Sequence, residues 1–509
     1  METKTAAIEM RNITKRFGPV LANDKVWLNI YRGEILALLG ENGSGKTTLM
    51  NMLSGIYFPD EGEIKIDGKE VVIRSPKDAF DNGIGMIHQH FKLVDVLTAA
   101  ENIVLGLPGK LDLKAASAKI REICDKYGFS VDPAQKIYDM SVSQKQTVEI
   151  VKVLYRGADI LILDEPTAVL TPQETDKLFA VLRNMRNDGK AIVIITHKMH
   201  EVEALSDRVA ILRHGQFIGD MLTAHTNAQE MTNMMVGHAV SLNIERPDPV
   251  DPKPRIEVKG LTVRSVDGII KLDDVSFTAN SGEILGIAGI SGCGQKELLE
   301  AIAGLQTVES GSISYIEDDG SLEELIGKDP LSIAELGVSL SFVPEDRLGM
   351  GLVGNMNLAD NMMLRSFRRG KSIFTDRRSP RALAESVVQE LSVSTPSVDT
   401  PVRRLSGGNV QKVLVGREIA SAPTVLLTAY AVRGLDIHSS YTIYDLINRQ
   451  KKAGVAVIFV GEDLDVLLEL CDRILVLCGG KVSGIVSGRG AEKREVGMMM
   501  TKLGGQSHE

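Results

Sequence analysis

The chain has few cysteines and no long apolar run, and each shortage argues against a class of protein. Its four cysteines are scattered, without CxxC pairs or histidines at ligand spacing, and stand at Cys124, Cys293, Cys471 and Cys478. This pattern argues against a zinc site or a disulfide framework and favours a reduced, cytoplasmic compartment. No stretch approaches the roughly 18 uninterrupted apolar residues that a spanning helix needs, and the start, METKTAAIEMRN, lacks the apolar region of a signal peptide. Any role at a membrane is therefore expected to run through a partner.

Basic residues are outnumbered as well. Lys and Arg number 58 against 67 Asp and Glu, which gives a formal net charge of −9. Because there is no long basic run either, the electrostatic footprint of a general nucleic-acid binder is missing, and we expect no nucleic-acid partner. The 509 residues, 43% of them apolar, are too many for one hydrophobic core, so we expect two large globular domains.

What the sequence does contain is a long internal repeat. The segment YRGEILALLGENGSGKTTLMNMLSG (31–55) recurs as NSGEILGIAGISGCGQKELLEAIAG (280–304), and SDRVAILRHGQFIG (206–219) recurs as CDRILVLCGGKVSG (471–484). In each copy, short β-branched runs alternate with longer helical stretches, which is typical of an α/β domain with a mostly parallel sheet. Four prolines between the copies favour an extended, semi-rigid linker. We place the two domains at 5–242 and 255–505, with a proline-rich linker at 243–254.

A glycine-rich motif in the first copy lies between an apolar strand and the start of a helix. It satisfies GxxxxGK[ST], and the residues predicted to bind ATP are Gly40, Glu41, Asn42, Gly43, Ser44, Gly45, Lys46, Thr47 and Thr48. Glycines let backbone N–H groups crowd the phosphates at a helix N-terminus. Lys46 neutralises the β- and γ-phosphates, and the Thr47 hydroxyl ligates Mg²⁺. The sequence therefore predicts a phosphate site at this turn.

A second strand of this copy, in ADILILDEPT (158–167), ends in two carboxylates. The carboxyl end of a strand in an α/β sheet is where ligands bind. Asp164 suits a contact to Mg²⁺ through one of the metal's ligands or through water, and Glu165 is placed to polarise the attacking water. Such a pair on its own is more often a turn, but after a P-loop we favour the catalytic interpretation.

Two further strands deliver single polar residues. GMIHQHF (85–91) places Gln89 after a short strand, and AIVIITHKM (191–199) places His197 where it could contact the γ-phosphate. His88 and His90 alternate along an extended segment and so point to opposite faces, which argues against a metal site.

This set and order of motifs resembles the ABC ATPases over nearly the whole chain, about 5–240 and 255–500. The resemblance implies two tandem P-loop domains, each with a RecA-like core, an antiparallel β subdomain and a helical subdomain. It also implies that Gln89 takes part in catalysis and contacts Mg²⁺, that His197 is the catalytic switch histidine, and that Phe17 stacks on adenine. An ordinary core aromatic is the alternative for Phe17.

The signature of that family, LSGGQ, appears in the second copy as residues 405–409, LSGGN, at the start of a helix. Ser406, Gly407 and Gly408 supply a hydroxyl and N–H donors suited to a γ-phosphate. The resemblance implies that this loop completes the ATP site of the opposite domain, so that the two domains pair head to tail within one chain around two ATPs.

The second copy has the same frame with different chemistry. Alignment by glycines puts Gln295 at the Lys46 position and Lys296 at the Thr47 position, and the offset of 265 residues seen between Asp207 and Asp472 fixes the rest. At this offset, Ala429, Tyr430 and Glu462 stand at the positions of Asp164, Glu165 and His197. Gln89 aligns with Glu345, which does not follow this offset. The first copy's own signature position, Met140 to Gln144, lacks both glycines. We therefore predict one competent composite ATP site and one that is silent or only holds nucleotide.

Tandem domains with a degenerate second copy resemble the ATP-hydrolysing subunits of importers for monosaccharides and nucleosides. Segments 84–106 and 154–174, with Gln295, look most like the nucleoside subgroup, whereas Ala429-Tyr430-Ala431-Val432 departs from its pattern, so a sugar or a vitamin stays open as substrate. The resemblance implies ATP and Mg²⁺ as cofactors, and two transmembrane permease subunits and an extracytoplasmic solute-binding lipoprotein as partners. It places the chain at the cytoplasmic face of the cell membrane. The rival from another class is a soluble ABC ATPase acting on nucleic acid or ribosomes.

Overall fold

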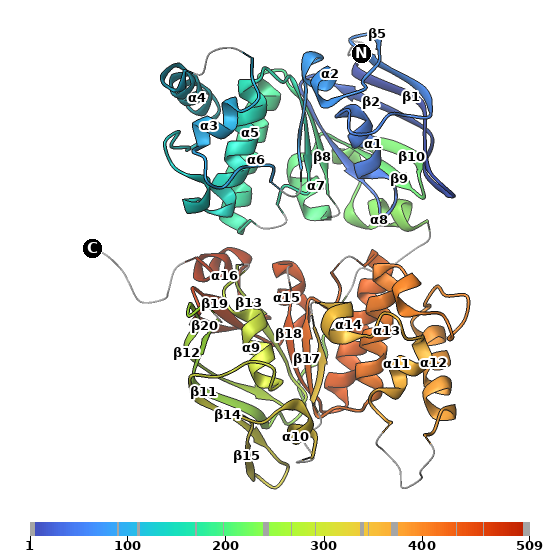
Figure 1. Cartoon of the computed structure of the whole chain (residues 1–509), viewed down its shortest axis with the longest axis vertical. Helices are drawn as coiled ribbons and strands as arrows, with labels where there is room; N and C mark the ends of the chain where they lie inside the picture. The colour runs from blue at the N-terminus through green and yellow to red at the C-terminus, as the bar shows by residue number, and fades with distance from the viewer. Residues whose placement is uncertain are drawn as a thin grey trace. The chain divides into compact units, whose positions relative to one another are not determined.

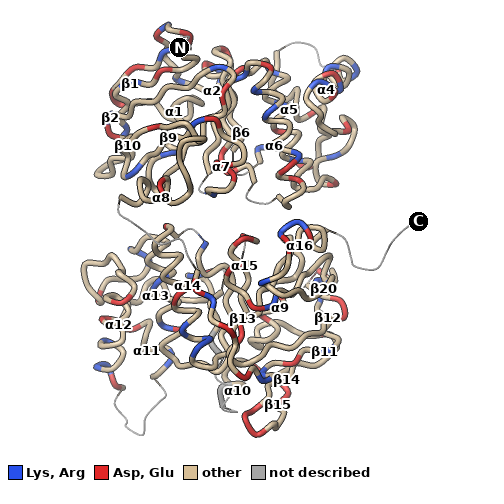
Figure 2. Tube along the Cα trace, turned by 180° about the vertical axis from the view of Figure 1, so that it is seen from behind, with Lys and Arg blue, Asp and Glu red and all other residues tan. Residues whose placement is uncertain are grey.

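The computed structural model describes residues 6–88, 91–108, 112–167, 170–196, 198–237, 244–265, 267–290, 292–335, 340–344, 346–367, 375–433, 435–461 and 463–501. Its contacts divide the chain into two compact units, residues 1–241 and 242–509, here called unit 1 and unit 2 (Figure 1). In the described part of both units, basic and acidic residues are interspersed along the chain (Figure 2).

Unit 1 contains an antiparallel sheet and a mostly parallel one. The antiparallel sheet has the order β2 (Val20–Tyr31), β1 (Ala6–Phe17), β4 (Glu61–Ile66) and β5 (Lys69–Val71). The second sheet has the order β10 (Gln216–Leu222), β9 (Arg208–Arg213), β3 (Glu34–Leu39), β8 (Ala191–Ile195), β7 (Ile160–Asp164) and β6 (Ile84–Ile87). Only the β9–β10 pair in it is antiparallel. Every residue of β3, β7 and β8 is buried, which is why these strands are near-continuous apolar runs in the sequence.

In unit 1, the helices of residues 99–187 gather on the side away from β1 and β2, whereas the helix that starts at Lys46 contacts β2 (Figure 1). The helices of unit 1 flank the parallel sheet (Figure 1). They are α1 (Lys46–Leu53), α2 (Pro76–Asp81), α3 (Ala99–Val104), α4 (Leu113–Tyr127), α5 (Val142–Tyr155), α6 (Pro172–Asn187), α7 (Met199–Leu205) and α8 (Ala228–Val236), with 3-10 turns at Ile137–Asp139 and Thr223–His225. Reciprocal capping fixes several starts: in α6 the Thr171 hydroxyl accepts from the Glu174 N–H while the Glu174 carboxylate accepts from the Thr171 N–H.

Unit 2 repeats this architecture. Its antiparallel sheet has the order β12 (Ile270–Asn280), β11 (Pro254–Arg264), β14 (Ser310–Ile316) and β15 (Leu322–Glu324). The second sheet has the order β16 (Leu340–Val343), β17 (Val425–Ala429), β18 (Ala456–Val460), β13 (Ile284–Ala288), β19 (Arg473–Cys478) and β20 (Lys481–Ser487). Read from its other edge, this is the strand order of unit 1. The structure thus confirms the α/β class and the duplication.

The helices of unit 2 follow the same plan. They are α9 (Gln295–Ile302), α10 (Pro330–Glu335), α11 (Leu358–Met363), α12 (Arg378–Glu390), α13 (Gly407–Ala420), α14 (Ile437–Lys452), α15 (Leu464–Leu470) and α16 (Lys493–Met499), with a π-turn at Arg347–Gly351 and a 3-10 turn at Val402–Arg404. The helix α13 corresponds to α5 of unit 1, since each follows a serine that caps its first turn.

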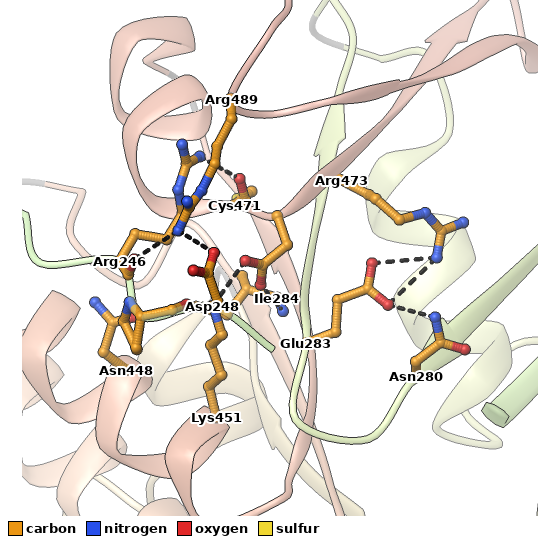
Figure 3. Close-up of polar contacts among 12 residues, drawn as sticks. Arg246, Asp248, Asn280, Glu283, Ile284, Asn448, Lys451, Cys471, Arg473 and Arg489 are labelled. Carbon is orange, nitrogen blue, oxygen red and sulfur yellow. Dashed lines mark hydrogen bonds and ion pairs between the residues drawn. The ribbon is translucent and has the colours of Figure 1, made fainter. Parts of the chain in front are cut away.

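The start of the proline-rich linker, residues 244–248, lies against unit 2 as an extended strap (Figure 3). Arg246 donates to the carbonyls of Leu468 at 2.7 Å and Cys471 at 2.6 Å, at the end of α15. Arg489 in turn donates to the Arg246 carbonyl at 3.1 Å and pairs with Asp248 at 2.5 Å. The sequence predicted an extended segment, and these contacts show what the extended segment lies on.

The strap also covers an ion pair that both units possess. In unit 2, Lys451 at the end of α14 pairs with Asp472 at 2.7 Å and donates to the Pro247 carbonyl of the strap. The two side chains are only 1% and 8% exposed. The counterpart in unit 1, Arg186 with Asp207 at 2.8 Å, is 27% and 38% exposed. The same pair is therefore buried in one unit and open to solvent in the other.

We expect Lys451→Met to lower the free energy of unfolding of unit 2 by about 3–5 kcal/mol, because it leaves the buried Asp472 without its cation. The matched change in unit 1, Arg186→Met, is expected to cost about 1 kcal/mol or less, since water screens and solvates Asp207. Hydrogen exchange read peptide by peptide, with increasing urea, reports the two units separately. Equal losses in both units would contradict the burial of the pair under the strap.

Candidate ATP site

The glycine-rich turn of unit 1 connects the buried strand β3 to α1. Gly45 is the N-cap of α1 with φ of 94°, and a Cβ there would lie 2.3 Å from the Ala22 carbonyl oxygen. Gly43 also has a positive φ, 83°, but faces open space. Only glycine fits the left-handed, crowded position at 45. The first N–H groups of α1 have no partner within the helix, as at any helix start, and can therefore bind an anion.

Lys46 turns back into this loop. Its Nζ donates to the carbonyls of Gly40 at 2.6 Å and Glu41 at 2.9 Å, and the side chain is buried. Burial lowers the pKa of Lys46 to about 8, against the opposing attraction of Glu165, Asp164 and Glu41. A phosphate next to Nζ would favour the charged form, because an anion within a few ångströms raises the pKa of an ammonium group.

The carboxyl end of β7 meets the start of α1. The Thr47 hydroxyl donates to Asp164 at 3.3 Å, and Asp164 is 8% exposed. Burial, followed by the neighbouring Glu165, raises the pKa of Asp164 above its usual value. A hydroxyl and a carboxylate side by side are the hard oxygen ligands that Mg²⁺ prefers, and its remaining positions usually go to phosphate oxygens and water. Thr47 and Asp164 therefore fit the predicted Mg²⁺ ion.

Glu165 has an unusual backbone conformation, with φ of 45°. Its N–H donates to the Ile195 carbonyl of β8 at 2.9 Å, which ties the turn to the neighbouring strand. Tyr430 in unit 2 has the same turn, with φ of 53° and an N–H donated to Val460 at 2.9 Å. Non-glycine residues in this region are costly and often stand at functional sites. Both units thus present the residue after β7 or β17 in the same way, with a carboxylate only in unit 1.

The second glycine-rich turn has Gln295 in the place of Lys46. Gln295 is 3% exposed, and its amide donates to the Ile290 carbonyl at 3.2 Å, inside the loop. Lys296 lies outside, with a side chain 52% exposed and paired with Glu300 at 3.8 Å. This geometry agrees with the alignment by glycines and leaves no ammonium group within the second loop.

The signature segment of unit 2 starts α13. Ser406 is the N-cap, and its hydroxyl accepts from Asn409 Nδ2 at 2.9 Å, while Gly407 and Gly408 form the first turn. Arg347 donates to the Gly407 carbonyl at 3.0 Å, a contact that sequence analysis missed. In unit 1 Ser141 caps α5 in a reciprocal pair with Gln144.

Other predicted residues lie elsewhere or outside the description. Gln89 and His197 fall outside the described residues, as do Glu345 and Glu462 of unit 2. Phe17, at the end of β1, is 42% exposed and packs edge-on against Tyr57 with ring centroids 5.1 Å apart. Such exposure does not fit the alternative of an ordinary core aromatic. Its stacking on adenine stays a prediction.

A group of buried polar side chains around Pro166 and Thr167, directly after Glu165, was not predicted from the sequence. They are Gln146, Thr167, Thr196 and Glu201, each between 3% and 4% exposed. Thr196 directly follows an apolar strand, which is a sequence signal, but Gln146 stands in the polar stretch SQKQT (143–147), and its partner Pro166 is 20 positions away.

A glycine-rich turn before a helix, a lysine inside it and a hydroxyl beside a strand-end carboxylate are the features of a P-loop nucleotide-binding domain, and unit 1 has all of them. Unit 2 repeats the fold and the glycine-rich turn without the lysine and the carboxylate. The ABC transporter family model matches residues 23–168 and 272–428. The chain belongs to the ABC transporter family and is its ATPase component. In the described part of the chain, we find no helix long and apolar enough to cross a bilayer.

Many curated relatives match this chain, several of them over nearly the full length. The nucleoside import ATP-binding protein NupA of Lactococcus lactis is 42% identical over 99% of both chains. The guanosine import ATP-binding protein NupO of Bacillus subtilis is 40% identical over 97% of both chains. The glucose import ATP-binding protein TsgD13 of Haloferax volcanii is 39% identical, over 98% of this chain and 96% of its own.

Proposed function

We propose that this chain is the ATP-hydrolysing subunit of an importer for nucleosides. The observation that carries the proposal is the full-length similarity to NupA, at 42% identity, supported by NupO, which is named for the import of guanosine. The similarity to TsgD13, named for glucose import, is only slightly lower and makes a monosaccharide the second candidate. The ligand itself would be recognised by permease and receptor subunits, which this chain does not contain.

The hydrolytic site of the proposal draws on both units. Lys46, Thr47, Asp164, Glu165 and His197 of unit 1 would act with Ser406, Gly407 and Gly408 of unit 2, in a head-to-tail pairing within the chain. Gln295, Ala429 and Tyr430 would act with Ser141, Val142 and Ser143 in a second site that does not hydrolyse ATP. Support for this division comes from the correlated replacements: the turn with lysine and carboxylates is in one unit and the glycine-containing signature in the other.

In the first site, each residue has a role that follows from its chemistry. Lys46 would bind the β- and γ-phosphates, and Thr47 and Asp164, with Gln89, would hold Mg²⁺, which neutralises charge on the transferred phosphoryl group. Glu165 would accept the proton of the attacking water. Ser406 and the N–H groups at the start of α13 would bind the γ-phosphate from the other side.

The partners in this proposal are two transmembrane permease subunits and an extracytoplasmic solute-binding lipoprotein, which would place the chain at the cytoplasmic face of the membrane. The test is to purify the chain with the permease subunits that accompany it and to screen the associated receptor by calorimetry against nucleosides, glucose and ribose. We expect binding of nucleosides alone. Binding of monosaccharides alone would overturn the nucleoside assignment, and co-purification with ribosomes in place of permeases would favour the soluble rival.

A further inference from the structure

Two residues directly after Glu165, Pro166 and Thr167, are held from both sides by buried polar side chains. Gln146, in the second turn of α5, donates from its amide to the Pro166 carbonyl at 2.6 Å. On the other side the Thr167 hydroxyl donates to the carboxylate of Glu201, which belongs to α7. Gln146 and Glu201 are each 4% exposed, so neither contact competes with bulk water.

The carboxylate of Glu201 joins two strand ends. While one oxygen accepts from Thr167, after β7, the other accepts from the Thr196 hydroxyl at 3.1 Å, directly after β8. Lys198 lies 3.3 Å from the same carboxylate and compensates its charge. A buried carboxylate is costly unless it is hydrogen-bonded and paired, and Glu201 is both. Glu201 therefore links the segment directly after Glu165 with the segment directly after β8.

Unit 2 lacks both ties. Gln411 occupies the position of Gln146, 265 residues further on, but neither its amide nitrogen nor its amide oxygen has a hydrogen-bond partner among the described residues. The positions of Thr167, Thr196 and Glu201 are taken by Val432, Gly461 and Val466, none of which can form such bonds.

The turn after the strand nevertheless forms in unit 2. Tyr430 has φ of 53° and bonds to Val460, just as Glu165 has φ of 45° and bonds to Ile195. Folding of this turn therefore does not require the two ties. The two ties are found in the unit whose turn carries a carboxylate, Glu165, and are missing from the unit whose turn carries Tyr430.

We propose that Gln146 and Glu201 are positioning residues for ATP hydrolysis, which hold Pro166 and Thr167 so that the Glu165 carboxylate stays directed at the attacking water. The inference rests on the proposed role of Glu165 as base. Displacement of a reacting group by about 1 Å costs roughly a hundredfold in rate, so the loss of one tie has a measurable effect without removal of the base itself.

The experiment uses the full chain with its permease partners and compares Gln146→Leu with its counterpart Gln411→Leu. For Gln146→Leu we expect the kcat of ATP hydrolysis to fall about tenfold to a hundredfold, with the Kd for Mg-ATP changed by less than about twofold. Gln411→Leu removes an amide of the same size without a partner, and we expect an unchanged kcat. Equal kcat for Gln146→Leu and the wild type, or equal losses in the two variants, would overturn the proposal.

A second pair of variants examines the Glu201 side through Thr167. Thr167→Val keeps the shape of the side chain and removes the donor, so we expect a similar fall in kcat; Thr167→Ser keeps the hydroxyl and is expected to restore most of it. Parallel losses of kcat, Mg-ATP affinity and melting temperature in Thr167→Val would indicate a purely structural tie and overturn the proposal. If Glu165→Gln leaves hydrolysis intact, the proposed role of Glu165 as base is wrong. If Glu165→Gln abolishes hydrolysis and Gln146→Leu and Thr167→Val do not change it, only the positioning role is wrong.

Discussion

Replacing Glu165 by glutamine is expected to reduce steady-state ATP hydrolysis about 10²- to 10⁴-fold. Glutamine has the shape of glutamate but cannot accept the proton of the attacking water. Because Lys46, Thr47 and Asp164, the residues proposed to bind Mg-ATP before the chemical step, are unchanged, we expect the Kd for Mg-ATP to stay within about threefold of the wild type. Phosphate release and equilibrium binding of a fluorescent ATP analogue measure the two quantities separately.

The control is the residue at the same turn of unit 2. Tyr430→Ala changes a side chain that packs against the core of unit 2, and the guanidinium carbon of Arg433 lies 5.9 Å from the centroid of its ring. The substitution removes no carboxylate. We expect its hydrolysis rate to remain near that of the wild type, with Tyr430→Phe as a variant that keeps the packing. A large loss of activity in both Tyr430 variants would mean that the two units share the chemistry, contrary to the proposed division.

The sheets could be predicted from the sequence because their signals are local. Strands β3, β7 and β8 are buried on both faces, so they are near-continuous apolar runs, and the duplication showed similar runs twice. The strap could be predicted only as extended, from its prolines. Its contacts to Leu468, Cys471 and Arg489 lie more than 200 positions away in the chain, and nothing in the linker itself indicates them.

The same distinction holds for the site. The glycine-rich turn and the Asp164–Glu165 pair are short local motifs of the kind that suits phosphate and Mg²⁺, so the sequence alone indicated them. Gln146 and Glu201 contact Pro166 and Thr167 across 20 and 34 positions, and only the fold brings them together. A comparison of the two copies could have flagged Glu201, since Thr167, Thr196 and Glu201 are all replaced by residues without a hydrogen-bonding side chain in unit 2. It could not have flagged Gln146, whose counterpart Gln411 is the same residue.

Substituting the signature serine of unit 2 should be nearly as damaging as removal of the base in unit 1. Ser406→Arg puts a long cation where a hydroxyl and the first N–H groups of α13 are proposed to bind the γ-phosphate, and we expect hydrolysis to fall about a hundredfold or more, the loss typical of a removed oxyanion donor. Ser141→Arg makes the same change, and removes the same N-cap, in α5 of unit 1. Its effect on hydrolysis should be less than about twofold, because the site it faces is proposed to be inactive, and an N-cap contributes only about 1 kcal/mol to stability.

Mixing two inactive chains then distinguishes pairing within a chain from pairing between chains. A Ser406→Arg chain retains the unit 1 residues, and a Glu165→Gln chain retains the signature of unit 2. If each site forms within one chain, as proposed, the mixture stays as inactive as its components at every protein concentration. Recovery of hydrolysis that rises with concentration would show that unit 1 of one chain works with unit 2 of another, and a Ser141→Arg chain as inactive as Ser406→Arg would show that both signatures are needed. Persistent inactivity of the mixture, together with an active Ser141→Arg chain, is the outcome that the division between the two units requires.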